Sequence, residues 1–257
     1  MKSATLGAAL KAAISLGACA VAALVPMSAA AQTPQLPPPD TLTARGGNIT
    51  IQPVNHASFV MTYRGLVIYV DPVGSVERYL NLPLPDLIVV TDIHGDHMNA
   101  GTINALVSPH TRIIAPAAVN AQLTPNLQAR TTVVQNRQTT TWEGITFEAV
   151  PMYNVTEGRT HLHTPGRGNG YIITFGNRRI YVAGDTEPTR EMAALRNIDV
   201  AFVPMNQPFT MTPQQAADAV RSFRPRIVYP YHSRNSDLDE FTRLVGDASE
   251  VRLRAWY

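Results

Sequence analysis

The chain has 257 residues, of which 45% are hydrophobic and 16% are charged. This composition excludes a disordered, highly charged protein, and the length suits one large domain or two small ones. The formal net charge is +2, but the only two lysines, Lys2 and Lys11, lie within the first eleven residues. The remaining chain carries 19 arginines and 19 acidic side chains. It therefore lacks the basic surplus that a nucleic-acid partner requires.

Residues 1–31 have the pattern of a secretory signal peptide. Lys2 and Lys11 flank an alanine- and leucine-rich run that reaches Val25, and Ala29-Ala30-Ala31 supplies a small-x-small cleavage site. We expect cleavage after Ala31, export to a periplasmic location, and no stable membrane span in the mature chain. Leu16-Gly17-Ala18-Cys19 resembles a lipoprotein box, so lipid attachment at Cys19 is the alternative. Because Cys19 is the only cysteine, the mature chain has no disulfide and no thiolate metal ligand.

Residues 32–47 are rich in proline and are predicted to form a leader, and residues 48–257 are predicted to form one domain. Short β-rich runs are expected to be strands at 49–51, 58–61, 66–70, 86–91, 112–115, 140–142, 145–150, 171–175, 179–182, 200–203, 227–229 and 251–256. Helices are expected at 102–107, 117–123, 189–195, 214–223 and 238–245, the fourth with Thr212 as N-cap and Pro213 at its first position. This order predicts an α/β fold with two sheets sandwiched between helices.

The chemistry is concentrated in Asp92-Ile93-His94-Gly95-Asp96-His97, which follows the apolar strand Leu87–Val90. In extended backbone Asp92 and His94 point the same way, because side chains alternate with a period of two. Gly95 permits a bend, after which Asp96 and His97 can face a neighbouring point. One short loop at a strand end can therefore supply ligands to two adjacent metal ions, whereas a merely solvated polar loop rarely gathers two carboxylates and two imidazoles.

This motif resembles the metallo-β-lactamase superfamily, whose signature is His-x-His-x-Asp-His after a buried strand, with Asp92 in the place of the first histidine. Further points of resemblance are Asn55-His56-Ala57-Ser58-Phe59, Gly184-Asp185-Thr186 and Tyr229-Pro230-Tyr231-His232. They are most similar to the lactonase-like and N-acylphosphatidylethanolamine phospholipase-like branch. The resemblance implies a four-layer αββα sandwich with its metals at one edge between the sheets.

The resemblance also implies two metal sites. One would hold Asp92, His94 and a mid-chain histidine, and the other would hold Asp96, His97 and His232, with Asp185 bridging both. For the mid-chain ligand we choose His163, which lies just before the next strand, with His161 as the competitor and Asn154 as a poor zinc ligand. His56 is interpreted as structural or as a support for the ligands, and His110 as a surface residue. Tyr153, Arg167, Asn169 and Tyr231 lie near the proposed ligands in sequence and are candidates for substrate contact.

A pair of divalent metals lowers the pKa of a bridging water towards about 7 and makes hydroxide available at neutral pH. Asp96 is the candidate catalytic residue, because it can orient this hydroxide as well as bind metal. Zinc is the expected metal, and the extra carboxylate of Asp92 also suits manganese or iron. Whether Asp92 ligates at all stays open, since the first site could be weak or empty.

These features predict an exported metal-dependent hydrolase that acts on a small molecule and cleaves an ester, lactone, phosphodiester or amide bond. Resemblance to the superfamily does not by itself imply β-lactam hydrolysis, because function depends on the site and its loops. The branch resemblance favours a lactone or phosphodiester over a β-lactam. Two alternatives remain: an iron-dependent oxidoreductase of the same fold, and a non-catalytic exported metal- or ligand-binding protein.

Overall fold

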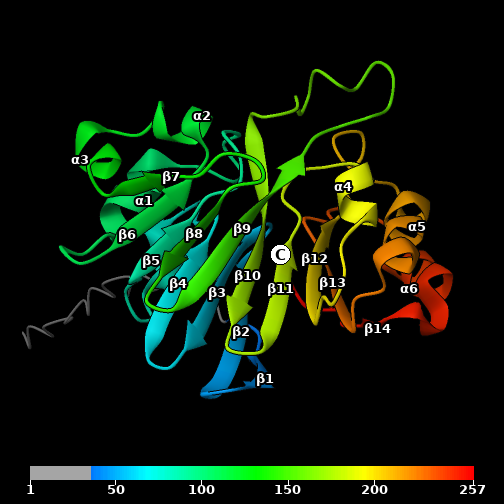
Figure 1. The fold of residues 1–257 in the computed structure, drawn as a ribbon, viewed down its shortest axis with the longest axis horizontal. Coiled ribbons are helices and arrows are strands. Elements are labelled where there is room, and N and C mark those ends of the chain that lie inside the picture. The colour runs from blue at the N-terminus through cyan, green and yellow to red at the C-terminus, as the bar shows by residue number, and fades with distance from the viewer. Residues whose placement is uncertain (1–35) are drawn as a thin grey trace, which may run out of the picture. The chain divides into compact units, whose positions relative to one another are not determined.

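The computed structural model describes residues 36–257, which build two seven-stranded sheets packed face to face (Figure 1). The predicted signal peptide and Cys19 lie outside the described residues. In spatial order the first sheet contains β1 (Asp40–Ala44), β2 (Gly47–Asn55), β3 (Ser58–Tyr63), β4 (Leu66–Val70), β5 (Leu87–Val89), β6 (Arg112–Ala115) and β7 (Thr131–Val133). The second contains β14 (Glu250–Val251), β13 (Ile227–Tyr231), β12 (Val200–Pro204), β11 (Arg178–Val182), β10 (Gly168–Phe175), β9 (Ile145–Met152) and β8 (Thr139–Trp142).

Helices cover the outer face of each sheet, so the predicted αββα sandwich is confirmed (Figure 1). The first sheet carries α1 (Ala100–Leu106), α2 (Ala117–Asn120) and α3 (Pro125–Gln128), and the second carries α4 (Arg190–Ala193), α5 (Pro213–Phe223) and α6 (Leu238–Val245). Short 3-10 helices lie at Val76–Tyr79 and Gly246–Ala248. Thr212 caps α5 by accepting a hydrogen bond from the amide of Gln215, as predicted. Among residues 36–257, no helix combines the length and apolar character needed to cross a bilayer.

Both sheets change from antiparallel to parallel pairing along the chain, and this change positions the site. Strands β1 to β4 and β8 to β11 pair antiparallel, whereas β4 to β7 and β11 to β14 pair parallel. The carboxyl ends of parallel strands lie at one edge of a sheet, and the loops that follow them gather there. The loops after β4, β5, β11, β12 and β13 therefore bring residues distant in sequence to a common edge.

Three apolar layers hold the sandwich together. The central layer lies between the sheets, where the rings of Phe59 and Phe202 stack with centroids 4.2 Å apart and Trp256 packs edge-on against both. The two outer layers bury the apolar faces of the helices, with Phe223 and Phe241 on the second sheet and Ile103 on the first. Burial of side chains on both faces accounts for the continuous apolar runs in the parallel strands.

The sequence predicts a leader over residues 32–47, but Asp40–Ala44 forms strand β1 and pairs antiparallel with β2. The Asp40 carboxylate accepts hydrogen bonds from Arg254 at 2.7 and 2.8 Å and from the Tyr229 hydroxyl at 2.8 Å. Burial alone would raise the pKa of Asp40, but these partners lower it. Because both partners lie near the other end of the chain, local sequence gives no sign of them.

The final strand is also shorter than predicted. The sequence predicts a strand over 251–256, but β14 covers only Glu250–Val251. The segment beyond it leaves the sheet because the Trp256 side chain enters the central core, where only 2% of the residue is exposed. The carbonyl of Trp256 accepts a hydrogen bond from the amide of His56 at 2.8 Å, which ties this segment to the loop between β2 and β3. Helix α3 and strand β7 were not predicted, since each has only three or four residues.

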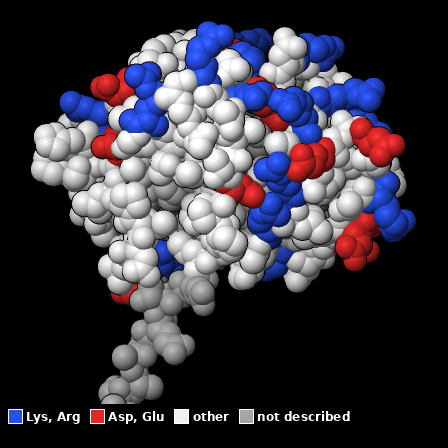
Figure 2. Space-filling model, turned by 90° about the horizontal axis from the view of Figure 1, so that it is seen from below, with Lys and Arg blue, Asp and Glu red and all other residues white. Residues whose placement is uncertain are grey.

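Charged side chains are interspersed on the surface. On the face shown in Figure 2, arginines and carboxylates alternate over a largely uncharged background. Ion pairs among the described residues include Arg221 with Asp218 and Arg252 with Glu250. This face offers no continuous basic surface of the kind that binds a phosphate backbone.

Candidate metal centre

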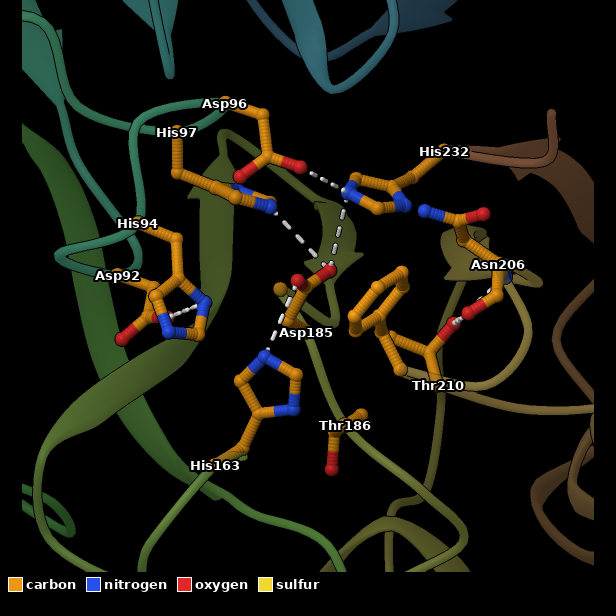
Figure 3. Close-up of polar contacts among 12 residues, drawn as sticks. Asp92, His94, Asp96, His97, His163, Asp185, Thr186, Asn206, Thr210 and His232 are labelled. Atoms are coloured by element: carbon orange, nitrogen blue, oxygen red, sulfur yellow. Dashed lines mark hydrogen bonds and ion pairs between the residues drawn. The ribbon is translucent and has the colours of Figure 1, made fainter. Parts of the chain in front are cut away.

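The motif loop lies where the two sheets meet at the carboxyl edge of their parallel strands. Residues 92–97 follow β5 and precede α1, whose N-cap Asn99 accepts a hydrogen bond from the amide of Thr102. Asp185 follows β11, His232 follows β13, and His163 lies in the loop between β9 and β10. Figure 3 shows these side chains converging on one region from both sheets. Every metal ligand proposed from the sequence is thus brought to this edge.

Asp185 is the centre of this arrangement. Its Oδ1 lies 3.2 Å from Nε2 of His97, and its Oδ2 lies 3.2 Å from Nε2 of His163. Nε2 of His232 lies 3.4 Å from Oδ1 of the same carboxylate, so three imidazoles surround it (Figure 3). The Asp185 residue is only 2% exposed. Gly184 precedes it with a φ of +66°, and a Cβ there would lie 2.4 Å from Sδ of Met152, so glycine is needed at this turn.

His97 is oriented by a buried carboxylate that the sequence reasoning missed. Nδ1 of His97 lies 2.8 Å from Oδ2 of Asp71, which also accepts a hydrogen bond from the Thr91 hydroxyl at 2.6 Å. A proton on Nδ1 leaves the lone pair of Nε2 free to bind a metal ion on the side of Asp185. Metal-binding carboxylate–histidine pairs have the same arrangement. Asp71 directly follows β4, the parallel neighbour of β5, so the rule that carboxyl ends meet at one edge could have identified it.

His163, and not His161, is the mid-chain histidine that lies beside Asp185. His163 is 1% exposed and its Nδ1 lies 3.1 Å from Oδ1 of Asn154, whereas His161 is exposed. The Asn154 oxygen can accept only if Nδ1 carries the proton, which leaves the His163 Nε2 lone pair directed at Asp185. Asn154 therefore supports a ligand and does not replace it.

Asp96 is held by two histidines and is more exposed than Asp185. Its Oδ2 lies 3.0 Å from Nε2 of His56 and 3.1 Å from Nε2 of His232. The other ring nitrogen of His56 lies 2.8 Å from the Tyr257 hydroxyl. His56 therefore positions Asp96, in agreement with its interpretation as a structural or supporting residue. Asp96 retains 45% side-chain exposure, against 3% for Asp185, so it is the more accessible of the two carboxylates.

Four residues form a cluster that fits a divalent cation: Asp96, His97, Asp185 and His232, which we call the four-residue cluster. One ligand atom from each lies within 4.8 Å of all the others. Nε2 of His97 and Oδ1 of Asp185 are buried without a hydrogen-bond partner. Buried polar atoms are nearly always paired, and a shared cation would satisfy both of these atoms.

Asp92, His94 and His163 form a second group, the Asp92 cluster, whose ligand atoms also lie within 4.8 Å of one another. In this cluster the Asp92 carboxylate is already paired with a positively charged side chain, that of Arg167. Arg167 donates from Nε to Oδ1 of Asp92 at 3.1 Å and from Nη2 to Oδ2 at 2.9 Å. His94 Nδ1 lies 3.0 Å from the same Oδ2. As it stands, this arrangement does not fit a divalent metal, because both Asp92 oxygens are engaged.

The charges in the four-residue cluster shift one another's proton affinities. Burial alone would raise the pKa of Asp185, but the surrounding imidazoles hold it well below its ordinary value. Burial alone would lower the pKa of His97, but the carboxylates of Asp185 and Asp71 hold it well above its ordinary value. Hydrogen bonds from His232 and His56 lower the pKa of Asp96 against the effect of burial. Such a field favours a cation, and metal and protons compete for the same atoms.

Three of the four candidate substrate contacts are directed elsewhere. Asn169 is fully buried and donates to the carbonyl of Val134 at 2.7 Å, and the buried Tyr231 hydroxyl accepts from the amide of Gly184 at 3.0 Å. The Tyr153 hydroxyl donates to Glu191 at 2.8 Å in a neighbouring depression. These three side chains thus support the fold. Arg167 lies at the site, but it contacts Asp92 and His94.

A cavity of about 290 Å³ opens beside the four-residue cluster. Its walls combine polar cluster side chains with residues that the sequence reasoning missed, namely Leu162, Asn206 and Phe209. Asn206 follows β12 at the same carboxyl edge, and Figure 3 shows its side chain directed toward His232. Leu162 and Phe209 lie in irregular loops, for which no periodic pattern exists to identify them.

The chain resembles known proteins over most of its length. Residues 50–232 match the family described as the beta-lactamase superfamily domain. A UPF0173 metal-dependent hydrolase from Thermococcus onnurineus is 33% identical over 176 residues, which cover 65% of this chain and 77% of that protein. A relative of the same name from Pyrobaculum islandicum is 30% identical over 216 residues, covering 77% and 92% respectively. The crystal structure of a putative metal-dependent hydrolase from Parabacteroides distasonis has 40% identity and a TM-score of 0.79, covering 84% of this chain and 98% of that one.

The fold, the arrangement of carboxylates and imidazoles, and the family match lead to one conclusion. The chain belongs to the metallo-β-lactamase superfamily, as the sequence resemblance predicted. Its site is that of a metal-dependent hydrolase of this superfamily.

Loss of the Asp71–His97 contact should weaken metal binding. In Asp71→Asn the amide oxygen still accepts from the Thr91 amide, but the amide nitrogen cannot accept from Nδ1 of His97. We expect zinc affinity to fall about 10- to 100-fold, which is typical for loss of a partner that orients a ligand. Competition with a chromogenic chelator measures it, with the exposed Asp247→Asn as the control. Equal affinities for the two folded variants would contradict the role assigned to Asp71.

Proposed function

We propose that this protein is an exported zinc-dependent hydrolase of small, uncharged carboxylic esters or lactones. Membership of the superfamily supports metal-dependent hydrolysis, and the N-terminal sequence supports export. The single observation that carries the choice of substrate is the make-up of the cavity beside the four-residue cluster. Apart from imidazoles, the described residues that line it include no basic side chain.

The cavity walls favour a neutral substrate with an apolar portion. Leu162 and Phe209 supply apolar surface, and about 290 Å³ accommodates a small molecule. Arg234 lines a separate depression that shares Asp96 and Asn206 with this cavity. A phosphodiester carries its own negative charge and is usually bound by arginine or lysine, so an ester or lactone is the better match.

The donor set of the four-residue cluster consists of two carboxylates and two imidazoles, which suits zinc and also accommodates manganese or iron. A divalent metal held there lowers the pKa of bound water towards about 7 and so supplies hydroxide at neutral pH. Asp96, whose side chain is 45% exposed and whose Oδ2 lies 3.0 Å from His56, would orient a water molecule in the cavity. The Asn206 amide, directed toward His232, can donate a hydrogen bond to a substrate oxygen (Figure 3).

The proposal predicts selective turnover that depends on the cluster. A panel of nitrophenyl butyrate, δ-valerolactone, bis(nitrophenyl) phosphate and a chromogenic β-lactam should show highest kcat/KM for the ester or the lactone. His97→Ala and Asp185→Asn should each lower that value by at least about 100-fold, because loss of metal activation is worth several kcal/mol. Treatment with a chelator should abolish turnover, and added zinc should restore it.

His110→Ala is the matched control for His97→Ala, since His110 is an exposed imidazole outside the cavity. It should retain the activity of the unaltered protein. Preference for the phosphodiester would refute the substrate assignment. Metal binding without turnover of any compound in the panel would favour the binding-protein alternative. Oxygen uptake by an iron-loaded protein would favour the oxidoreductase.

Export is proposed from the first 31 residues, with cleavage after Ala31. Expression of the full chain in a Gram-negative host should yield a periplasmic protein whose N-terminal residue is Gln32. A cytoplasmic protein that retains residues 1–31 would contradict export. Lipid on Cys19 would instead establish the lipoprotein alternative.

A further inference from the structure

Asp92, which stands where the family motif has its first histidine, is paired with Arg167. The two hydrogen bonds, at 3.1 and 2.9 Å, use both carboxylate oxygens and two different guanidinium nitrogens. The Asp92 side chain has no exposed surface, and that of Arg167 is 17% exposed. A bidentate, largely buried pair of this kind is the strongest form of charge-assisted hydrogen bond between side chains.

The backbone fixes Arg167 beside Asp92. Arg167 directly precedes Gly168, the first residue of β10, and the amide of Asn169 donates to the carbonyl of Thr91 at 2.9 Å. A Cβ on Gly168 would lie 2.9 Å from this Thr91 carbonyl and 2.2 Å from Cε of Met152. Because glycine permits this close approach, β10 begins directly against the residue before Asp92. Arg167 is thus built into the site and is not a mobile surface arginine.

The other ligands of the Asp92 cluster are also engaged. His94 directs Nδ1 at Asp92 at 3.0 Å, and its Nε2 lies 3.4 Å from Nη2 of Arg167. Only Nε2 of His163 remains in this group without a hydrogen-bond partner. Together with Asp185 Oδ2, it offers fewer ligand atoms than the three or four protein ligands of a zinc site.

The four-residue cluster differs in the kind of partner that its carboxylates have. Asp96 and Asp185 face imidazoles, whose protons a metal can displace, and His97 Nε2 and Asp185 Oδ1 have no hydrogen-bond partner. Neither Asp96 nor Asp185 has an arginine partner among the described residues. One position at this edge is therefore open to a metal, and the other already holds a positive charge.

We infer that Arg167 is the resident cation of the Asp92 position, so that the protein binds one divalent metal, at the four-residue cluster, where the family motif implies two. This inference rests on the proposed metal-dependent function. The guanidinium stays charged at all physiological pH values and cannot dissociate. The positive charge beside His94 is thus independent of metal supply. Removal of Arg167 frees the Asp92 carboxylate and creates a second metal site.

The test is metal stoichiometry, which requires no substrate. The purified protein is equilibrated with Mn²⁺ or Zn²⁺, dialysed, and assayed by elemental analysis and by electron paramagnetic resonance of the manganese form. We expect one equivalent and an uncoupled manganese signal for the unaltered protein. Arg167→Gln should bind two equivalents with a spin-coupled signal. Arg167→Gln combined with Asp92→Asn should return to one.

Arg178→Ala is the matched control, because Arg178 pairs with Asp199 at 2.7 Å and is similarly buried but contacts neither metal-ligand cluster. It should keep one equivalent. Two tightly bound equivalents in the unaltered protein would overturn the inference, whether or not any arginine variant folds. One equivalent in folded Arg167→Gln would also overturn it. Binding of no metal by the unaltered protein would refute the metal-dependent function itself.

Discussion

The site depends on one buried carboxylate. Asp185 lies among three imidazoles delivered by the motif loop, by the loop between β9 and β10, and by the end of β13. A charge removed from water costs several kcal/mol unless partners surround it. These imidazoles satisfy it in part, and a cation in the four-residue cluster completes its environment. The ends of both sheets are thus held together by the group that binds the metal.

Backbone strain is concentrated around the same point. His56, Asp71, Gly184 and His232 all have positive φ, between 44° and 66°. For residues other than glycine this conformation costs about 1–2 kcal/mol each. Hydrogen bonds hold two of the strained turns against each other, since the amide of His232 donates to the carbonyl of His56 at 3.2 Å. His56, Asp71 and His232 each directly follow a strand, so the strained conformation lies where the regular backbone of β2, β4 and β13 ends.

The sequence contained the ligands but not their partners. The motif Asp92–His97 could be predicted because it follows an apolar strand, and the resemblance to the superfamily implied Asp185 and His232. His163 could be preferred to His161 only from its closeness to the next strand. The Asp92–Arg167 pair, whose members are 75 positions apart in the sequence, has no local signature. Asn169 and Tyr231 were misassigned because closeness to a ligand in sequence does not reveal which way a side chain points.

The most direct test of a single metal centre around Asp185 is a crystal structure of the zinc-loaded protein with anomalous scattering recorded at the zinc edge. The account predicts one strong peak within about 2.0–2.2 Å of ligand atoms from Asp96, His97, Asp185 and His232. The Arg167 guanidinium should remain on Asp92. A peak of equal height between Asp92, His94 and His163, or no peak at the four-residue cluster, would contradict the account.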